Sequence, residues 1–219
     1  MAHNFGKIRA PFLRETNKSK TTTVGMWSNP IFEYLQNNEW VWTGKADGTS
    51  IGVKWDGERV SFVGHTDKSQ IPPKLLNFLT TSFGTDEAEA IFEELFGDKP
   101  FTLYGEGLSS ETNEDYGFPD GNFILFDVHN DNDDVFWNRD AVENVAQKFN
   151  LDIVPILLRG TIMDAVEFVK VVRPSPFDPL RPLEGLVGRP PVELKTTNGD
   201  RVICKVKYCD IVGGKPCLV

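Results

Sequence analysis

With 219 residues and a mass of 24.6 kDa, the chain has the size of one large domain, or of one domain with a small appendage. An apolar content of 40%, including 11% aromatic residues, is enough for a hydrophobic core, and no apolar run is long enough to span a membrane. The formal net charge of −9 argues against a protein that coats nucleic acids without specificity.

The cysteine and histidine residues give no pattern of a metal or redox site. The three cysteines lie near the end of the chain without a C-x-x-C pair, and the three histidines are scattered. We therefore expect free thiols in a reducing compartment. The first 20 residues are polar and carry no apolar signal-peptide core, so the expected location is the cytoplasm, which for a phage-encoded protein is that of the host.

The order of the predicted elements favours an α+β fold with antiparallel sheets. Residues 1–28 are expected to be a loosely structured polar arm, and residues 29–219 a single domain. Apolar periodicity, turn residues and proline positions predict helices over residues 31–36, 72–79, 86–96, 139–149 and 162–171. Strands are predicted over residues 39–44, 49–55, 59–63, 101–104, 123–128, 153–158 and 183–187, with a final hairpin over residues 191–208 that turns at Asn198-Gly199.

Lys45-Ala-Asp-Gly48, between two predicted strands, is a candidate covalent nucleotide carrier. The motif alone is weak, because short matches of this kind arise by chance. A lysine becomes nucleophilic when its pKa, ordinarily about 10.4, is lowered by burial or nearby positive charge. Lys205 and Lys207 could supply that charge, since alternation along a strand puts both on one face; the alternative is a solvated strand edge.

Three further motifs carry residue types suited to nucleotide chemistry. Glu106 and Glu184 each adjoin a glycine near the end of a predicted strand, and carboxylate oxygens are typical Mg²⁺ ligands. Phe126-Asp127 ends an apolar strand, where the aromatic ring could stack on a base. Taken singly, each also fits a simpler interpretation, as a surface carboxylate or a core strand.

Together, in this order, the lysine motif, Gly105-Glu106, Phe126-Asp127, Glu184-Gly185 and Lys205-x-Lys207 resemble the motif series of the covalent nucleotidyltransferases, which comprise RNA ligases, DNA ligases and mRNA capping enzymes. The resemblance runs from about Glu39 to Tyr208 and is strongest to phage-type RNA ligases that seal nicks in double strands. It implies a nucleotidyltransferase domain, in which antiparallel sheets flank a nucleotide groove and helices lie outside.

The resemblance also implies an activity. Lys45 would attack the α-phosphate of ATP to form lysyl-AMP, AMP would pass to an RNA 5′-phosphate, and a 3′-OH would then displace AMP. Mg²⁺ or Mn²⁺ would assist. The implied catalytic residues are Lys45, Lys205 and Lys207.

The nucleotide would be bound by these lysines together with Trp42, Thr43, Gly44, Asp47, His65, Glu106, Phe126 and Glu184. Within that set, Glu106 would contact the ribose, Phe126 the adenine, and Glu184 with Asp47 the metal ion. Two positions depart from the family pattern: His65 stands where relatives typically have arginine, and Gly44 where many have glutamate.

The expected partner is RNA with 3′-OH and 5′-phosphate ends in a nicked duplex. Few residues follow Lys207, so we expect a minimal ligase without the C-terminal domain of its relatives. Two alternatives stay open: a nucleotidyltransferase with another acceptor, such as a DNA nick, and an inactive module that binds nucleotides or RNA ends. The departures at His65 and Gly44 motivate the second alternative.

Overall fold

The computed structural model describes residues 5–15, 21–64, 69–110 and 118–218. These residues fall into two units, and the chain passes from one unit to the other after residues 6, 46 and 154. Unit 1 comprises the described residues within 1–6 and 47–154, and unit 2 those within 7–46 and 155–219. These breaks do not coincide with the predicted division into an arm over residues 1–28 and a domain over residues 29–219.

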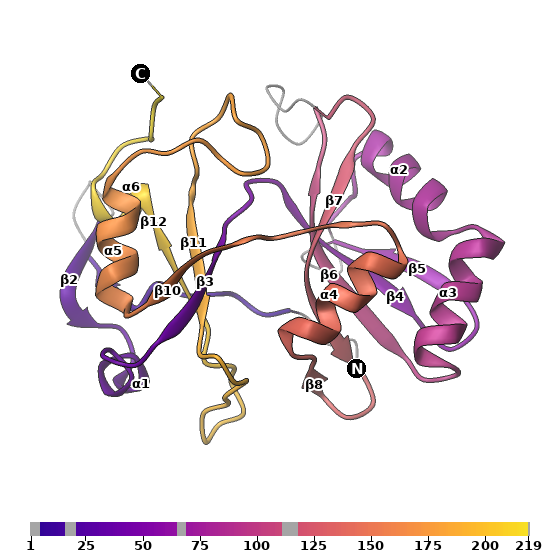
Figure 1. The fold of residues 1–219 in the computed structure, drawn as a ribbon, viewed down its shortest axis with the longest axis horizontal. Coiled ribbons are helices and arrows are strands. Elements are labelled where there is room, and N and C mark those ends of the chain that lie inside the picture. Colours follow the sequence, from indigo (N-terminus) through magenta and orange to yellow (C-terminus); the bar gives the residue numbers. More distant parts are fainter. Residues whose placement is uncertain (1–4, 16–20, 65–68, 111–117, 219) are drawn as a thin grey trace. The chain divides into compact units, whose positions relative to one another are not determined.

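Unit 2 is built on a four-stranded antiparallel sheet with the order β10-β3-β11-β12 (Figure 1). Its strands are β3 (Trp40–Gly44), β10 (Ile156–Gly160), β11 (Gly185–Arg189) and β12 (Cys204–Lys207). The elements around this sheet are β1 (Phe12–Arg14), β2 (Thr22–Trp27), α1 (Pro30–Tyr34), α5 (Ile162–Lys170) and α6 (Tyr208–Ile211).

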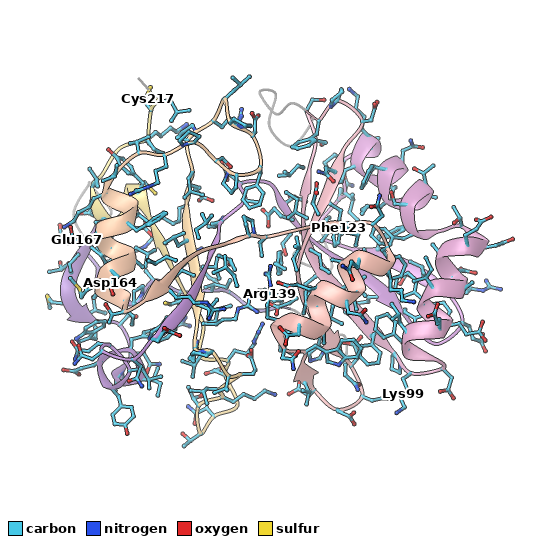
Figure 2. All side chains as sticks on the ribbon, viewed as in Figure 1. Lys99, Phe123, Arg139, Asp164, Glu167 and Cys217 are labelled. Carbon is cyan, nitrogen blue, oxygen red and sulfur yellow. The ribbon has the colours of Figure 1, made fainter. Side chains whose placement is uncertain are left out.

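Helix α5 covers one face of this sheet. It starts with a capping box, in which Thr161 and Asp164 each accept a hydrogen bond from the other's backbone N–H, and Figure 2 shows Asp164 on this helix. The helix buries an apolar stripe of residues spaced three and four apart, which packs in one core with Trp40 and Trp42. The face of the sheet that carries these tryptophans is therefore closed to solvent.

The segment predicted to be a loose arm instead forms β1 and β2 where the structure describes it. Phe12 is 1% exposed, and its ring centroid lies 4.8 Å from that of Trp27. Arg14 donates two hydrogen bonds, of 2.8 and 2.9 Å, to the carboxylate of Asp210. The prediction was wrong here because β1 is held partly by Asp210, which is 196 positions from Arg14 in the chain.

Unit 1 contains a six-stranded sheet in which β5-β4-β6-β7-β8 follow one another as antiparallel neighbours and β9 pairs parallel with β7. Its strands are β4 (Thr49–Trp55), β5 (Val60–Val63), β6 (Phe101–Leu108), β7 (Asn122–Asn130), β8 (Val135–Phe136) and β9 (Asp152–Ile153). The helices are α2 (Pro73–Phe83), α3 (Asp86–Phe96) and α4 (Arg139–Lys148). Both units thus confirm the predicted α+β class with mainly antiparallel sheets.

The helices of unit 1 share one core with one face of its sheet. Leu75, Phe92 and Val145 from the three helices pack in the same cluster as Leu103 of β6 and Phe123 of β7. Figure 2 shows the Phe123 side chain on β7. Because side chains alternate along a strand, Glu106 of β6 lies on the opposite face, away from the helices.

Two predicted strands differ in the structure, in both cases near proline. Pro155 divides the strand predicted over residues 153–158 into β9 and β10. In the hairpin predicted over residues 191–208 only β12 is a strand, and it pairs with β11. Pro190 and Pro191 follow β11 directly and have no N–H for a sheet ladder.

Among the described residues, no helix is long and apolar enough to cross a membrane.

Candidate active site

Lys45 lies directly after β3, at the end of the sheet of unit 2. Its backbone N–H donates to the carbonyl of Gly185 at 3.0 Å, so pairing with β11 continues one residue beyond the strand. The Lys45 Nζ lies 2.5 Å from Glu184 Oε2 and 3.1 Å from the carbonyl oxygen of Ala46. The predicted nucleophile is therefore held at both its backbone and its side chain.

Glu184 binds two lysines at once. Its Oε2 accepts from Lys45, while its Oε1 forms an ion pair with Lys207. Strand register explains this arrangement: Lys207 lies opposite Gly185 in the β11–β12 pair, and Glu184 is the residue just before Gly185. The structure thus brings together three of the predicted site residues that lie far apart in the sequence.

These contacts shift the ionisation of the cluster. Burial alone would raise the pKa of the Glu184 carboxyl, but the charge of Lys45 and the hydrogen bonds from Lys207 and Lys45 outweigh burial, and the pKa is lowered. Burial would lower the pKa of Lys207, but the hydrogen bond to Glu184 and its charge raise it. The Glu184–Lys207 pair is consequently stabilised in its charged form.

Lys205 differs from Lys207. It lies on the same face of β12 as Lys207, since the alternating residues Cys204 and Val206 point into the core, as strand alternation predicted. Its pKa is lowered, first by burial and then by the charges of Lys45 and Lys207. The cluster thus combines Lys207, whose charged form is stabilised by its ion pair, with Lys205, whose charged form is destabilised by burial and by the neighbouring lysines.

In unit 1, the Glu106 side chain is held by the backbone of Gly48, the glycine of the lysine motif. Its Oε1 accepts a 2.9 Å hydrogen bond from the Gly48 N–H. A Cβ at position 48 would overlap the carbonyl of Gly107 and the side chain of Leu108, so glycine permits the close approach of the two segments. The motifs at Gly48 and Glu106 are therefore in direct contact.

Phe126 and Asp127 lie at an irregularity in β7. Leu125 pairs with Gly105, but Asp127 pairs with Tyr104, so Phe126 is an extra residue without a position opposite it in β6. The Phe126 side chain is half-buried, whereas Asp127 is fully buried. Phe126 thus differs from its neighbours in strand pairing, and Asp127 differs from them as a buried carboxylic acid.

The prediction that Trp42, before Lys45, contacts the nucleotide requires a correction. The Trp42 ring is 0% exposed, belongs to the core beneath α5, and donates from Nε1 to the carbonyl of Gly160. Its ring therefore has no exposed face to offer a base. Thr43 is 5% exposed and its hydroxyl donates to the carbonyl of Val187, while Gly44 is packed against Leu157.

The remaining predicted positions are less informative. Asp47 is exposed and belongs to unit 1, and His65 lies outside the described residues. The described part of the chain contains no group of three or more His, Cys, Asp or Glu side chains arranged to hold a metal ion.

Sequence reasoning missed one aromatic residue beside these motifs. Phe5 lies in unit 1 with its ring centroid 5.0 Å from that of Phe126. A single phenylalanine in a polar segment shows no periodicity, so no signal in the sequence could have placed it there.

Comparison with known proteins agrees with this arrangement. The model of the RNA ligase family matches residues 38–207. Among solved structures, a mutant Naegleria gruberi RNA ligase with ATP and Mn matches with a TM-score of 0.62 and 16% identity, over 91% of this chain and 59% of that chain. Another mutant of that ligase with ATP and Mn gives a TM-score of 0.63 at 15% identity, over 91% and 59% of the two chains. An apo form gives 0.62 at 14% identity, over 92% and 60%.

The fold is therefore that of the RNA ligase nucleotidyltransferases. The chain belongs to the RNA ligase family, whose model covers well over half of its length. It spans about three fifths of the length of the Naegleria ligases that it matches. A search of curated protein sequences found no match.

Proposed function

We propose that the chain is an ATP-dependent RNA ligase that carries AMP on Lys45. The observation that carries this proposal is the contact of Lys45 Nζ with Glu184, on a sheet face that also holds Lys205 and Lys207. Membership of the RNA ligase family supports it. The Naegleria structures with ATP and Mn support ATP as the AMP donor.

In the first step, the Lys45 amine would form an N–P bond to the α-phosphate while the bond to the β-phosphate oxygen breaks and pyrophosphate leaves. The amine must first lose its proton, which passes to solvent, because the ammonium bound to Glu184 has no lone pair. Lys205 and Lys207 would stabilise the negative charge on the departing pyrophosphate.

The donor set of this cluster suits a divalent cation that arrives with the nucleotide. Glu184 is the carboxylate of the cluster and would hold Mg²⁺ or Mn²⁺, with Asp47 as the second proposed ligand; phosphate oxygens would complete the shell. The ion would neutralise phosphate charge during transfer.

Glu106 and Phe126 are the proposed contacts to the nucleoside. The Gly48 N–H fixes one carboxylate oxygen of Glu106, which orients the side chain to accept from a ribose hydroxyl. The half-buried Phe126 ring retains exposed surface on which an adenine could stack. Thr43, Gly44 and His65 stay predicted nucleotide contacts.

AMP would then pass to the 5′-phosphate of RNA, and a neighbouring 3′-OH would displace it to close the strand. The proposed substrate is a nicked duplex. A DNA nick is the alternative acceptor, and a module that binds nucleotides or RNA ends without turnover is the second alternative.

The test is a sealing assay after treatment with pyrophosphate, which removes any AMP already bound. Duplexes with one nick carry a labelled 5′-phosphate and either an RNA or a DNA strand on the 3′-OH side. Sealing that requires the RNA strand supports the proposal. Equal sealing of DNA favours the other acceptor, and a protein that binds ATP without forming lysyl-AMP is a binding module.

A further inference from the structure

Phe5 closes a cluster of aromatic rings in unit 1. Its ring centroid lies 5.0 Å from Tyr104, 5.0 Å from Phe126 and 5.8 Å from Phe136. The rings of Phe5 and Phe126 are inclined at 65°, and those of Phe5 and Phe136 at 89°, which are edge-to-face arrangements. Such pairs attract through the ring quadrupole as well as through buried area.

The four rings are not equally fixed. Tyr104 and Phe136 are 3% and 4% exposed, and their centroids lie 6.2 Å apart, so they form the rigid base of the cluster. Phe5 and Phe126 are only half-buried. Phe5 thus links the half-buried ring of Phe126 to the buried pair of Tyr104 and Phe136.

The bulge makes such support necessary. Phe126 has no position opposite it in β6, so no cross-strand neighbour there fixes the direction of its side chain. Edge-to-face packing against Phe5 restricts its rotation. Directly after Phe5, Gly6 has φ +74, a conformation that glycine adopts easily, and the chain leaves unit 1 there.

We infer that Phe5 is a positioning residue for the base-stacking ring of Phe126. This inference rests on the proposed function, in which Phe126 stacks on the adenine of ATP. A ring already held in the stacking orientation binds a base without the entropy cost of ordering it. An aromatic pair of ordinary strength corresponds to about a 3- to 10-fold difference in affinity.

The measurement is calorimetric binding of α,β-methylene-ATP, which cannot transfer AMP, to the native chain and to Phe5→Ala, Phe126→Ala and the double variant. Phe5→Ala should weaken binding about 3- to 10-fold. It should have no further effect once Phe126 is gone, and Phe5→Tyr should bind as the native chain does. The inhibition constant of tripolyphosphate, which has no base, should stay unchanged in Phe5→Ala.

Each other result overturns the inference in a recognisable way. If Phe5→Ala binds more tightly, Phe5 competes with the base; if it binds equally, Phe5 has no role in binding. If Phe126→Ala leaves affinity unchanged, the base does not stack there, and that part of the proposed function fails together with the inference. Should Phe5→Ala not fold, Phe5→Leu removes the ring, keeps most of the volume, and is expected to weaken binding by a similar factor.

Discussion

Glu184 contacts two lysine side chains with its two carboxylate oxygens, and this makes it the electrostatic centre of the cluster. Its side chain is 16% exposed, and those of Lys45 and Lys207 are 20% and 23% exposed. At this burial, solvent screens the charges less than at the surface. Removing the carboxylate leaves Lys45, Lys205 and Lys207 close together without the acid that pairs with two of them.

Glu184→Gln should lower the free energy of unfolding at pH 7 by about 1 to 3 kcal/mol. Because the folded pKa of Glu184 is lowered, its stabilisation is complete above the ordinary pKa of about 4.3 and is lost as pH falls through the folded value. The difference in free energy of unfolding between the native chain and the variant should therefore disappear as pH falls below about 4. Denaturant unfolding at a series of pH values measures this.

The matched control is Glu94→Gln, which removes an exposed ion pair with Lys148. Surface pairs contribute about 0 to 1 kcal/mol, so this variant should show a small effect. If Glu184→Gln changes the free energy of unfolding equally little, or by an amount that does not depend on pH, the electrostatic role of Glu184 is contradicted.

At the scale of elements, the β3–β11 pair depends on a glycine that leaves room for a tryptophan. Gly188 lies opposite Trp42, and a Cβ at position 188 would overlap the indole ring. The ring covers the glycine in the strand interior, where a missing side chain would otherwise weaken packing.

Gly188→Ala should destabilise the fold by about 1 to 3 kcal/mol through overpacking. In a chain that carries Trp42→Phe, Gly188→Ala should lower the free energy of unfolding by less, because the smaller ring leaves space for the methyl group. Denaturant unfolding of the two single variants and the double variant gives the coupling. Strictly additive effects would show that the two side chains do not compete for one space.

The contact between β1 and α6 offers a second test at this scale. Asp210 is 4% exposed and accepts both hydrogen bonds from Arg14. Arg14→Met should lower the free energy of unfolding by about 1 to 2 kcal/mol, because the buried carboxylate of Asp210 loses its arginine partner. The loss is no larger because half of the Arg14 side chain is exposed and solvent screens its charge. Adding Asp210→Asn should recover part of that loss in denaturant unfolding. No loss in Arg14→Met would mean that β1 contributes nothing through this pair.

At the scale of the whole molecule, the net charge of −9 is compatible with a phosphate-binding cluster, because charge is distributed unevenly. Helix α3 carries Asp86, Glu87 and Glu89 in its first turn, where the helix dipole favours them. In unit 2, three lysines surround one carboxylate. Net charge therefore describes the surface as a whole and not the local field at Lys45.

The sequence predicted most helices, the fold class and the face of β12 that carries Lys205 and Lys207, because these depend on local periodicity and alternation. It could not place Trp42, since alternation puts Trp40 and Trp42 on one face but does not say that α5 covers that face. The β1–β2 pair and the role of Phe5 were missed for a related reason. The residues that pack against them are distant in sequence: Asp210 for β1, and Tyr104, Phe126 and Phe136 for Phe5.

The most direct test of the account is to locate AMP on the protein. After incubation with ATP and Mg²⁺, proteolysis and mass spectrometry should find AMP on the peptide that contains Lys45, through a bond that acid cleaves and alkali does not. Lys45→Ala should carry no AMP, and Lys99→Ala, which removes an exposed lysine labelled in Figure 2, should carry as much as the native chain. Absence of AMP from the native chain, or its attachment to another residue, would contradict the assignment of Lys45 as the nucleophile.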